Sequence, residues 1–252
     1  MNTESLLGKP LLLFEIVFGG NINMEWTKEQ RYRKMADVSE AEVQALSKLV
    51  NQCPWRQSFH IQPVTGLLND PNGFSYYNGE FHLFYQWFPL GPVHGLKHWY
   101  HTKSKDLVHW ENVGMAIEPS TEFDSHGAYS GSAIEQEGKL HLLYTGNTRD
   151  ENWIRHPYQC LAVMDSNGRV TKMEEPVIAD IPAGYTDHFR DPKVWEQDGQ
   201  FYAVIGAQRD NETGCVVLYR SANLKEWQFV GEMKTQLDEK FGYMWNVRII
   251  LS

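Results

Sequence analysis

The chain repeats itself with a period of about sixty residues, and this repeat limits the possible fold more than any other sequence feature. Each unit has a strand-like run, a turn at glycine and a second strand-like run, and the turn glycines Gly79, Gly138 and Gly199 lie 59 and 61 residues apart. A unit of this length, with alternating apolar residues, fits a four-stranded antiparallel sheet. Such sheets stacked around an axis form a β-propeller, which closes with about four to eight blades.

Three complete units begin with residues 69–86, 129–146 and 190–207, and the residues from Glu232 onward only begin a fourth. We therefore expect an all-β fold, an incomplete β-propeller with about three blades present. Three hairpin-rich segments of a single β-sandwich are the alternative, which the constancy of the long period disfavours.

Ahead of the repeat, the sequence predicts an extension and a short N-terminal helix. A helix is expected from Ser39, because Ser39 and Glu42 form the pattern of a capping box and apolar residues then recur at helical spacing as far as Cys53. The predicted division of the chain is an extension whose nativeness the sequence leaves open (1–23), an N-terminal helical segment (24–58) and the N-terminal part of a propeller domain (59–252).

Composition limits the classes of binding partner and the cellular compartment that we expect for the chain. The net charge of −9 argues against nucleic acid, because a polyanion is bound by a basic surface. No apolar stretch is long enough for a membrane span, and the apolar run near the start lacks a basic lead and a cleavage site, so neither membrane nor secretion is expected. Three widely spaced cysteines suit a reducing compartment, and we expect a cytoplasmic protein.

The repeat also predicts the position of a site. Asp70, Ser130 and Asp191 stand nine, eight and eight residues before their turn glycines, so each begins the first strand of its unit. Equivalent positions in a propeller converge on the axis and line one pocket. Two carboxylates in such a pocket are typical of glycoside hydrolysis, although an acid before proline is by itself more often a turn residue. Aromatic residues expected to stack on sugar rings are Trp87, Trp99 and Tyr100.

Four motifs, in order and spacing, resemble a known family. They are LLNDPNG at 67–73, FYQ at 84–86, YSGS at 129–132 and FRDP at 189–192, and they closely resemble the invertase-like β-fructofuranosidases, which include sucrose-6-phosphate hydrolases. The resemblance covers about residue 24 to residue 245. It implies a five-bladed β-propeller followed by a C-terminal β-sandwich that this chain would lack, and retaining hydrolysis of terminal β-fructofuranosyl bonds.

The resemblance assigns roles to the matching residues. Asp70 matches the nucleophile that forms a fructosyl-enzyme ester, and Arg190 with Asp191 matches the pair that grips the ring hydroxyls and stabilises the transition state. The expected substrate-binding residues are Leu67, Leu68, Asn69, Gln86, Tyr129, Ser130 and Arg190. The expected partner is a small sugar, sucrose 6-phosphate or sucrose, and no cofactor or metal is expected.

The phosphate of such a substrate needs a basic group, and His94 and Lys97 are the candidates within residues 93–105. The form with His94, where secreted invertases of the family commonly have Trp, resembles the sucrose-6-phosphate hydrolases. A solvated loop is an equally favoured interpretation of this stretch. A zinc site made by His94, His98 and His101 is disfavoured, because no acidic or cysteine partner accompanies the three histidines.

The family pattern breaks after Trp245. The family has a glutamate next, as general acid and base in a W-E-C-P stretch, whereas Asn246 follows here and has no titrating proton. Loss of a single G from codons for the family stretch can give the residues found, so we expect a truncated, poorly soluble and weakly active or inactive chain, which sequencing of the locus would test. The alternatives are a fructoside-binding pseudoenzyme and a five-bladed arabinan- or xylan-cleaving enzyme, which would not be expected to carry both NDPNG and FRDP.

Overall fold

The computed structural model describes residues 25–234 and 242–246, so the predicted extension at 1–23 lies outside the described residues. The helical elements in these ranges are α2 (Lys28–Arg31), η1 (Met35–Asp37) and α3 (Glu40–Asn51). The strands are β1 (Leu67–Tyr77), β2 (Glu80–Phe88), β3 (His98–Ser104), β4 (Glu111–Ile117), β5 (Ala128–Gln136), β6 (Lys139–Arg149), β7 (Arg155–Met164), β8 (Val170–Lys172), β9 (Tyr185–Gln197), β10 (Gln200–Arg209), β11 (Gly214–Ser221) and β12 (Trp227–Glu232). No helix in the described ranges is long and apolar enough to cross a bilayer.

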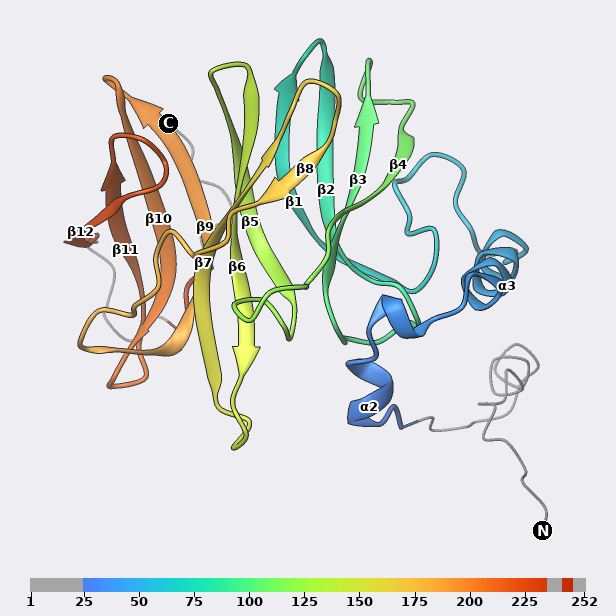
Figure 1. The fold of residues 1–252 in the computed structure, drawn as a ribbon, viewed down its shortest axis with the longest axis horizontal. Coiled ribbons are helices and arrows are strands. Elements are labelled where there is room, and N and C mark those ends of the chain that lie inside the picture. Colours follow the sequence, from blue (N-terminus) through green and yellow to red (C-terminus); the bar gives the residue numbers. More distant parts are fainter. Residues whose placement is uncertain (1–24, 235–241, 247–252) are drawn as a thin grey trace.

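The described strands form three four-stranded antiparallel sheets, each built from four strands consecutive in the chain (Figure 1). The predicted turns at Gly79, Gly138 and Gly199 are confirmed as two-residue hairpins. In each hairpin the glycine and the residue before it both have positive φ, the geometry that matches the twist of paired strands. Three separate sheets exclude the alternative of a single two-sheet sandwich for this part of the chain.

The sheets pack face to face, and β1, β5 and β9 are neighbouring first strands (Figure 1). One apolar cluster joins the first two sheets through residues such as Trp99 and Tyr144, and a second joins the last two through residues such as Leu161 and Phe189. Burial of these rings and aliphatic chains is the main force that holds one sheet on the next. Within the described residues the stack of sheets is open rather than closed into a ring.

The expectation that Trp87, Trp99 and Tyr100 stack on sugar rings is wrong. Trp99 is fully buried, and its indole N–H donates to the Tyr129 carbonyl at 2.9 Å. Trp87 and Tyr100 are also buried and pack edge to face, with ring centroids 5.0 Å apart. These aromatic side chains therefore form core, where burial of their large apolar surface stabilises the first sheet.

The predicted N-terminal helix is present as α3. Ser39 accepts from the Glu42 backbone N–H at 3.2 Å, but the Glu42 carboxylate binds Arg33 at 2.7 Å instead of completing the capping box. Leu46 of this helix packs on Phe88 and on the loop that follows β2. The helical segment thus covers one end of the first sheet.

The first strand of each sheet has a register shift beside the predicted site residue. One extra residue lies between Leu68 and Pro71 in β1, between Ala128 and Gly131 in β5, and between Arg190 and Lys193 in β9. Such bulges re-aim side chains and recur next to active sites. Strand β1 has a second extra residue, between Asn72 and Ser75. This explains why Asp70 stands nine residues before its turn glycine, whereas Ser130 and Asp191 stand eight residues before theirs.

Strands β5 and β9 are joined by a buried serine. The Ser132 hydroxyl donates to the Pro192 carbonyl at 2.9 Å and accepts from the Val194 N–H at 2.9 Å. Pro192 lies in the bulge that contains Asp191, and Val194 comes just after it. The hydroxyl therefore fixes the position of that bulge against the second sheet.

We predict that Ser132→Ala lowers the free energy of unfolding by about 1–3 kcal/mol, because two buried backbone groups lose their partner. Urea unfolding followed by circular dichroism measures the change. Ser166→Ala, at an exposed turn, is the matched control and should leave the midpoint unchanged. Equal midpoints for both variants would contradict this role of Ser132.

Candidate active site

A chain of hydrogen bonds runs from an ammonium group to a carboxylate across the first two sheets. Lys97 Nζ donates to Asn69 Oδ1 at 2.5 Å, and Asn69 Nδ2 donates to Gln86 Oε1 at 2.6 Å. Gln86 Nε2 then donates to Ser130 Oγ at 2.9 Å, and the Ser130 hydroxyl donates to Asp70 Oδ2 at 2.8 Å. Asn69, Gln86 and Ser130 each accept from one neighbour and donate to the next, so the chain fixes the orientation of both amides.

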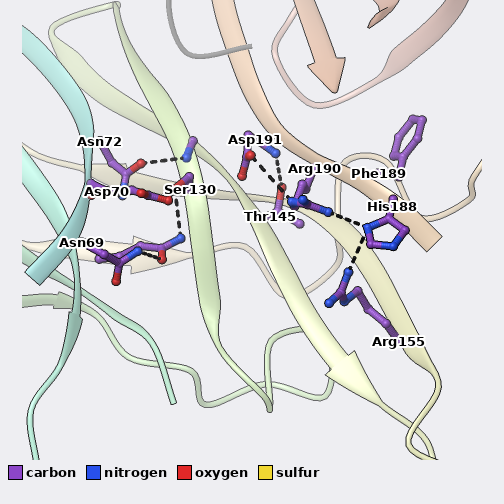
Figure 2. Close-up of polar contacts among 12 residues, drawn as sticks. Asn69, Asp70, Asn72, Ser130, Thr145, Arg155, His188, Phe189, Arg190 and Asp191 are labelled. Atoms are coloured by element: carbon purple, nitrogen blue, oxygen red, sulfur yellow. Dashed lines mark hydrogen bonds and ion pairs between the residues drawn. The ribbon is translucent and has the colours of Figure 1, made fainter. Parts of the chain in front are cut away.

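This chain brings together five residues predicted from the sequence: Asn69, Asp70, Gln86 and Ser130 of the sugar site and the phosphate candidate Lys97. Asn69 and Asp70 lie in the bulge of β1, Gln86 lies near the end of β2, and Ser130 lies in the bulge of β5. Lys97, Gln86 and Ser130 are buried, whereas Asn69 and Asp70 are half-buried. The Asp70 carboxylate thus stands at one end of the polar network, where the Ser130 hydroxyl fixes it (Figure 2).

The Lys97 ammonium is unusual because only 4% of the residue is exposed. Burial lowers the pKa of Lys97 to about 8, and the charge of Asp70 opposes that shift. Lys97 was predicted as a phosphate ligand at the rim, but its Nζ atom instead lies against Asn69 inside the network. Its role toward phosphate stays a prediction.

A second polar group surrounds Asp191 on β9. Thr145 Oγ1 accepts from the Asp191 N–H at 3.0 Å and donates to Gln159 Oε1 at 2.8 Å. Asp191 is buried and has a φ of 64°, a left-handed conformation that is uncommon outside glycine. Strain of this kind is found at sites where the surroundings hold a side chain in a required direction.

Arg190, beside Asp191, is oriented by a histidine. Arg190 Nη1 lies 3.0 Å from His188 Nδ1, and Arg190 Nε lies 3.8 Å from Asp191 Oδ2. Because a guanidinium can only donate, His188 Nδ1 is the acceptor and carries no proton. Burial and then the nearby arginine charges lower the pKa of His188, in agreement with a neutral ring.

Both polar groups are attached to strand β5 (Figure 2). Ser130 binds Asp70 on one side, and Ser132, two residues further, binds the backbone next to Asp191 on the other. The equivalent positions of the repeat are therefore linked through one strand. Two carboxylates, an arginine and several amide groups of this kind provide what sugar hydroxyls and an oxocarbenium-like centre require.

The remaining predicted residues lie around this arrangement. Leu67 and Leu68 begin β1 and pack into two different apolar clusters, and Tyr129 is half-buried beside Ser130. His94 is exposed, and its carbonyl accepts from Arg31 Nη1 at 3.2 Å. Partial desolvation of the imidazole by neighbouring atoms, followed by the charge of Lys97, lowers the pKa of His94, which makes a neutral ring the favoured form at pH 7.

Residues 93–105 do not form one basic patch, because most of them belong to β3 and point alternately to the two faces of the sheet. His98 and His101 are buried, which lowers the pKa of His98 to about 4 and that of His101 to about 3. Lys103 is bound by Glu80 at 3.2 Å. Among the described residues, no group of three or more His, Cys, Asp or Glu side chains is arranged to hold a metal ion.

Sequence reasoning missed Thr145, although the repeat contains a signal for it. Gln86 and Thr145 both stand seven residues after their turn glycines. In the structure both side chains form a hydrogen bond with the first strand of the following sheet. Gln86 donates to Ser130, and Thr145 accepts from the Asp191 N–H. Asn72 was also missed; its Oδ1 accepts from the Gly131 N–H at 3.2 Å and helps to join β1 to β5.

Residues 60–249 match the Glycosyl hydrolases family 32 N-terminal domain. The chain belongs to glycosyl hydrolase family 32. Family 32 membership confirms the resemblance predicted from the four motifs and makes the chain a glycoside hydrolase by family.

Relatives within the family agree. The sucrose-6-phosphate hydrolase of Staphylococcus xylosus is 52% identical over 221 residues, which are 88% of this chain and 44% of that protein. The structure of sucrose-6-phosphate hydrolase from Lactobacillus gasseri is 49% identical with a TM-score of 0.84, over 87% of this chain and 45% of that one. A Bombyx mori GH32 beta-fructofuranosidase mutant in complex with sucrose is 37% identical with a TM-score of 0.68, over 82% of this chain and 45% of that one. The chain therefore spans less than half the length of these relatives.

The buried ammonium of Lys97 predicts a pH dependence of stability. Below about pH 8 both folded and unfolded chains hold this proton; between about 8 and the ordinary value of 10.5 the unfolded chain holds it more often, so stability rises with pH. Relative to Lys97→Met, the wild-type chain should gain on the order of 3 kcal/mol over this range. Urea unfolding at a series of pH values measures the difference. Lys105→Met, an exposed control, should keep the wild-type rise, and a rise retained in Lys97→Met would contradict the assignment.

Proposed function

We propose that the site hydrolyses terminal β-D-fructofuranosides by a retaining double displacement, with Asp70 as nucleophile. The observation that carries the proposal is the chain of hydrogen bonds from Asn69 through Gln86 and Ser130 that fixes the Asp70 carboxylate, in a chain of family 32. Arg190 and Asp191 belong to the second polar group, on β9, and are suited to hydrogen-bond the fructose hydroxyls. Charge-assisted hydrogen bonds of this kind contribute about 1.5–3 kcal/mol each, which favours steep specificity for fructose.

The proposed reaction has two steps. An Asp70 oxygen attacks the anomeric C2, the bond from C2 to the leaving oxygen breaks, and that oxygen must take up a proton. Water then attacks C2 and gives up a proton to solvent, which replaces the proton that the leaving oxygen took up, while the ester bond to Asp70 breaks and the carboxylate is restored. The Asp191 carboxylate stabilises the positive charge that develops on the ring in both steps, and Arg190 donates hydrogen bonds to the ring hydroxyls.

We infer that the sugar is sucrose 6-phosphate or sucrose. Support comes from relatives named sucrose-6-phosphate hydrolase and from a family 32 structure in complex with sucrose. The phosphate role of His94 and Lys97 stays a prediction from the sequence. No nucleic-acid or membrane partner is proposed, and the reducing compartment expected from the cysteines is the cytoplasm.

The same resemblance supports a finer account of the fold. We propose that the three sheets belong to a five-bladed propeller that precedes a β-sandwich in the family, with residues 24–58 as a helical segment and 59–252 as part of the propeller domain. The face-to-face stacking of the three sheets and the adjacency of β1, β5 and β9 support this proposal.

A second candidate function is sugar binding without cleavage. It is favoured by Asn246, which stands where the family has its acid and cannot donate a titrating proton. Calorimetry with fructose and sucrose separates the two functions, because binding without release of fructose favours the second.

An activated substrate tests Asp70 independently of the acid, since nitrophenolate leaves without a proton. We predict that the chain cleaves p-nitrophenyl β-D-fructofuranoside and that Asp70→Asn lowers the rate by about 10³-fold or more. Release of nitrophenolate is measured by absorbance. Asp198→Asn, at an exposed turn, is the matched control and should retain the rate. An Asp70→Asn variant as active as this control would exclude Asp70 as nucleophile.

The role of position 246 gives a gain-of-function prediction. Asn246→Glu should raise the rate of sucrose hydrolysis by about 10²–10⁴-fold, because the leaving oxygen then receives a proton. Asn246→Gln has the same length without the titrating group and should change nothing. Fructose release measures both variants, and equal rates for the two would show that residue 246 is not the acid position.

A further inference from the structure

Two arginines face each other across the β6–β7 hairpin without an acidic partner. Arg149 and Arg155 are directly paired in the antiparallel register, where like charges repel. Both are half-buried, and the Nε atom of each is buried without a hydrogen-bond partner in the described part of the chain. No carboxylate among residues 25–234 and 242–246 forms an ion pair with either guanidinium. Buried donors and unneutralised cations of this kind are costly unless an anion joins them.

A third cation is held nearby. Arg155 Nη1 lies 3.5 Å from the same His188 Nδ1 atom that accepts from Arg190, so one neutral imidazole orients two guanidinium groups (Figure 2). Arg149 is fixed differently: its Nη1 donates to the Trp153 carbonyl at 2.7 Å, and its guanidinium lies 5.0 Å from the centre of the Trp153 ring. The positions of both hairpin arginines are therefore set by uncharged groups.

The cluster adjoins the candidate active site. Tyr129, next to Ser130 in β5, has its pKa raised mainly by burial, while the charges of Arg155, Arg149 and Arg190 all act in the opposite direction. Contacts join the cluster to the site as well, because Arg155 and Arg190, the neighbour of Asp191, meet at the same His188 nitrogen. Tyr129 is followed in β5 by Ser130, whose hydroxyl donates to the site carboxylate of Asp70.

We propose that Arg149 and Arg155 form the binding site for a phosphate group carried by the leaving half of the fructoside. The inference rests on the proposed function and adds the chemistry of the leaving group to it. Guanidinium groups stay charged at every physiological pH and present paired N–H donors that match phosphate oxygens. Lys97, in contrast, already gives a hydrogen bond to Asn69, and His94 is exposed on its loop.

Calorimetry on the full chain tests the proposal with sucrose 6-phosphate, sucrose and inorganic phosphate as titrants. Arg149→Gln and Arg155→Gln should each weaken sucrose 6-phosphate binding by about tenfold or more and leave sucrose binding unchanged within about twofold. Inorganic phosphate should compete with sucrose 6-phosphate for the wild-type chain and lose this effect in the double variant. Arg169→Gln, at the exposed turn before β8, is the matched control, and equal urea midpoints confirm that all variants are folded.

The outcomes separate the two proposals. Sucrose binding without preference for sucrose 6-phosphate would overturn the arginine site and leave the fructoside site standing. A preference lost in His94→Ala but kept in both arginine variants would also overturn it. Binding of neither sugar would overturn the proposed function and this inference together, and equal losses for both sugars in the arginine variants would show a structural role only.

Discussion

The hydrogen-bond chain from the Lys97 ammonium to the Asp70 carboxylate is the interaction on which the site depends. Its members come from the loop before β3 and from β1, β2 and β5, so the chain exists only when the first and second sheets are packed together. Burial of an ammonium or amide without a partner would lower the stability of the fold. Each hydrogen bond here instead satisfies a polar group that packing has removed from water. The apolar contacts that join the sheets and the polar contacts that define the site therefore require each other.

Strand β5 extends this dependence to the other half of the site. Two serines of β5 bind the neighbouring first strands: Ser130 binds Asp70 of β1, and Ser132 binds the β9 backbone next to Asp191. Bulges at equivalent places in β1, β5 and β9 turn the site residues away from the regular alternation of a strand. The site is thus a product of repeated local irregularity in an otherwise regular stack of sheets.

Much of this arrangement could be predicted from the sequence. The period of the turn glycines predicts three sheets, and the equivalence of Asp70, Ser130 and Asp191 predicts that they share one region, because periodic patterns report the repeated unit directly. The bulges could not be predicted, since one extra residue in a strand leaves no distinct pattern. The burial of Trp99 and the inward turn of Lys97 also depend on packing between sheets, which composition and local spacing do not report. The four motifs predicted the family from the sequence, and the family model that matches residues 60–249 confirmed it.

The hairpins at residues 78–79, 137–138 and 198–199 stand at the ends of β1, β5 and β9 that lie opposite the site residues. A side chain built on any of their three glycines would meet no neighbouring atom within 4 Å. Labels, fluorophores or inserted peptides attached at these loops would be separated from Asp70, Ser130 and Asp191 by seven or eight residues of extended strand. The molecule thus offers three attachment points for biosensor or immobilisation work that leave the recognition end untouched.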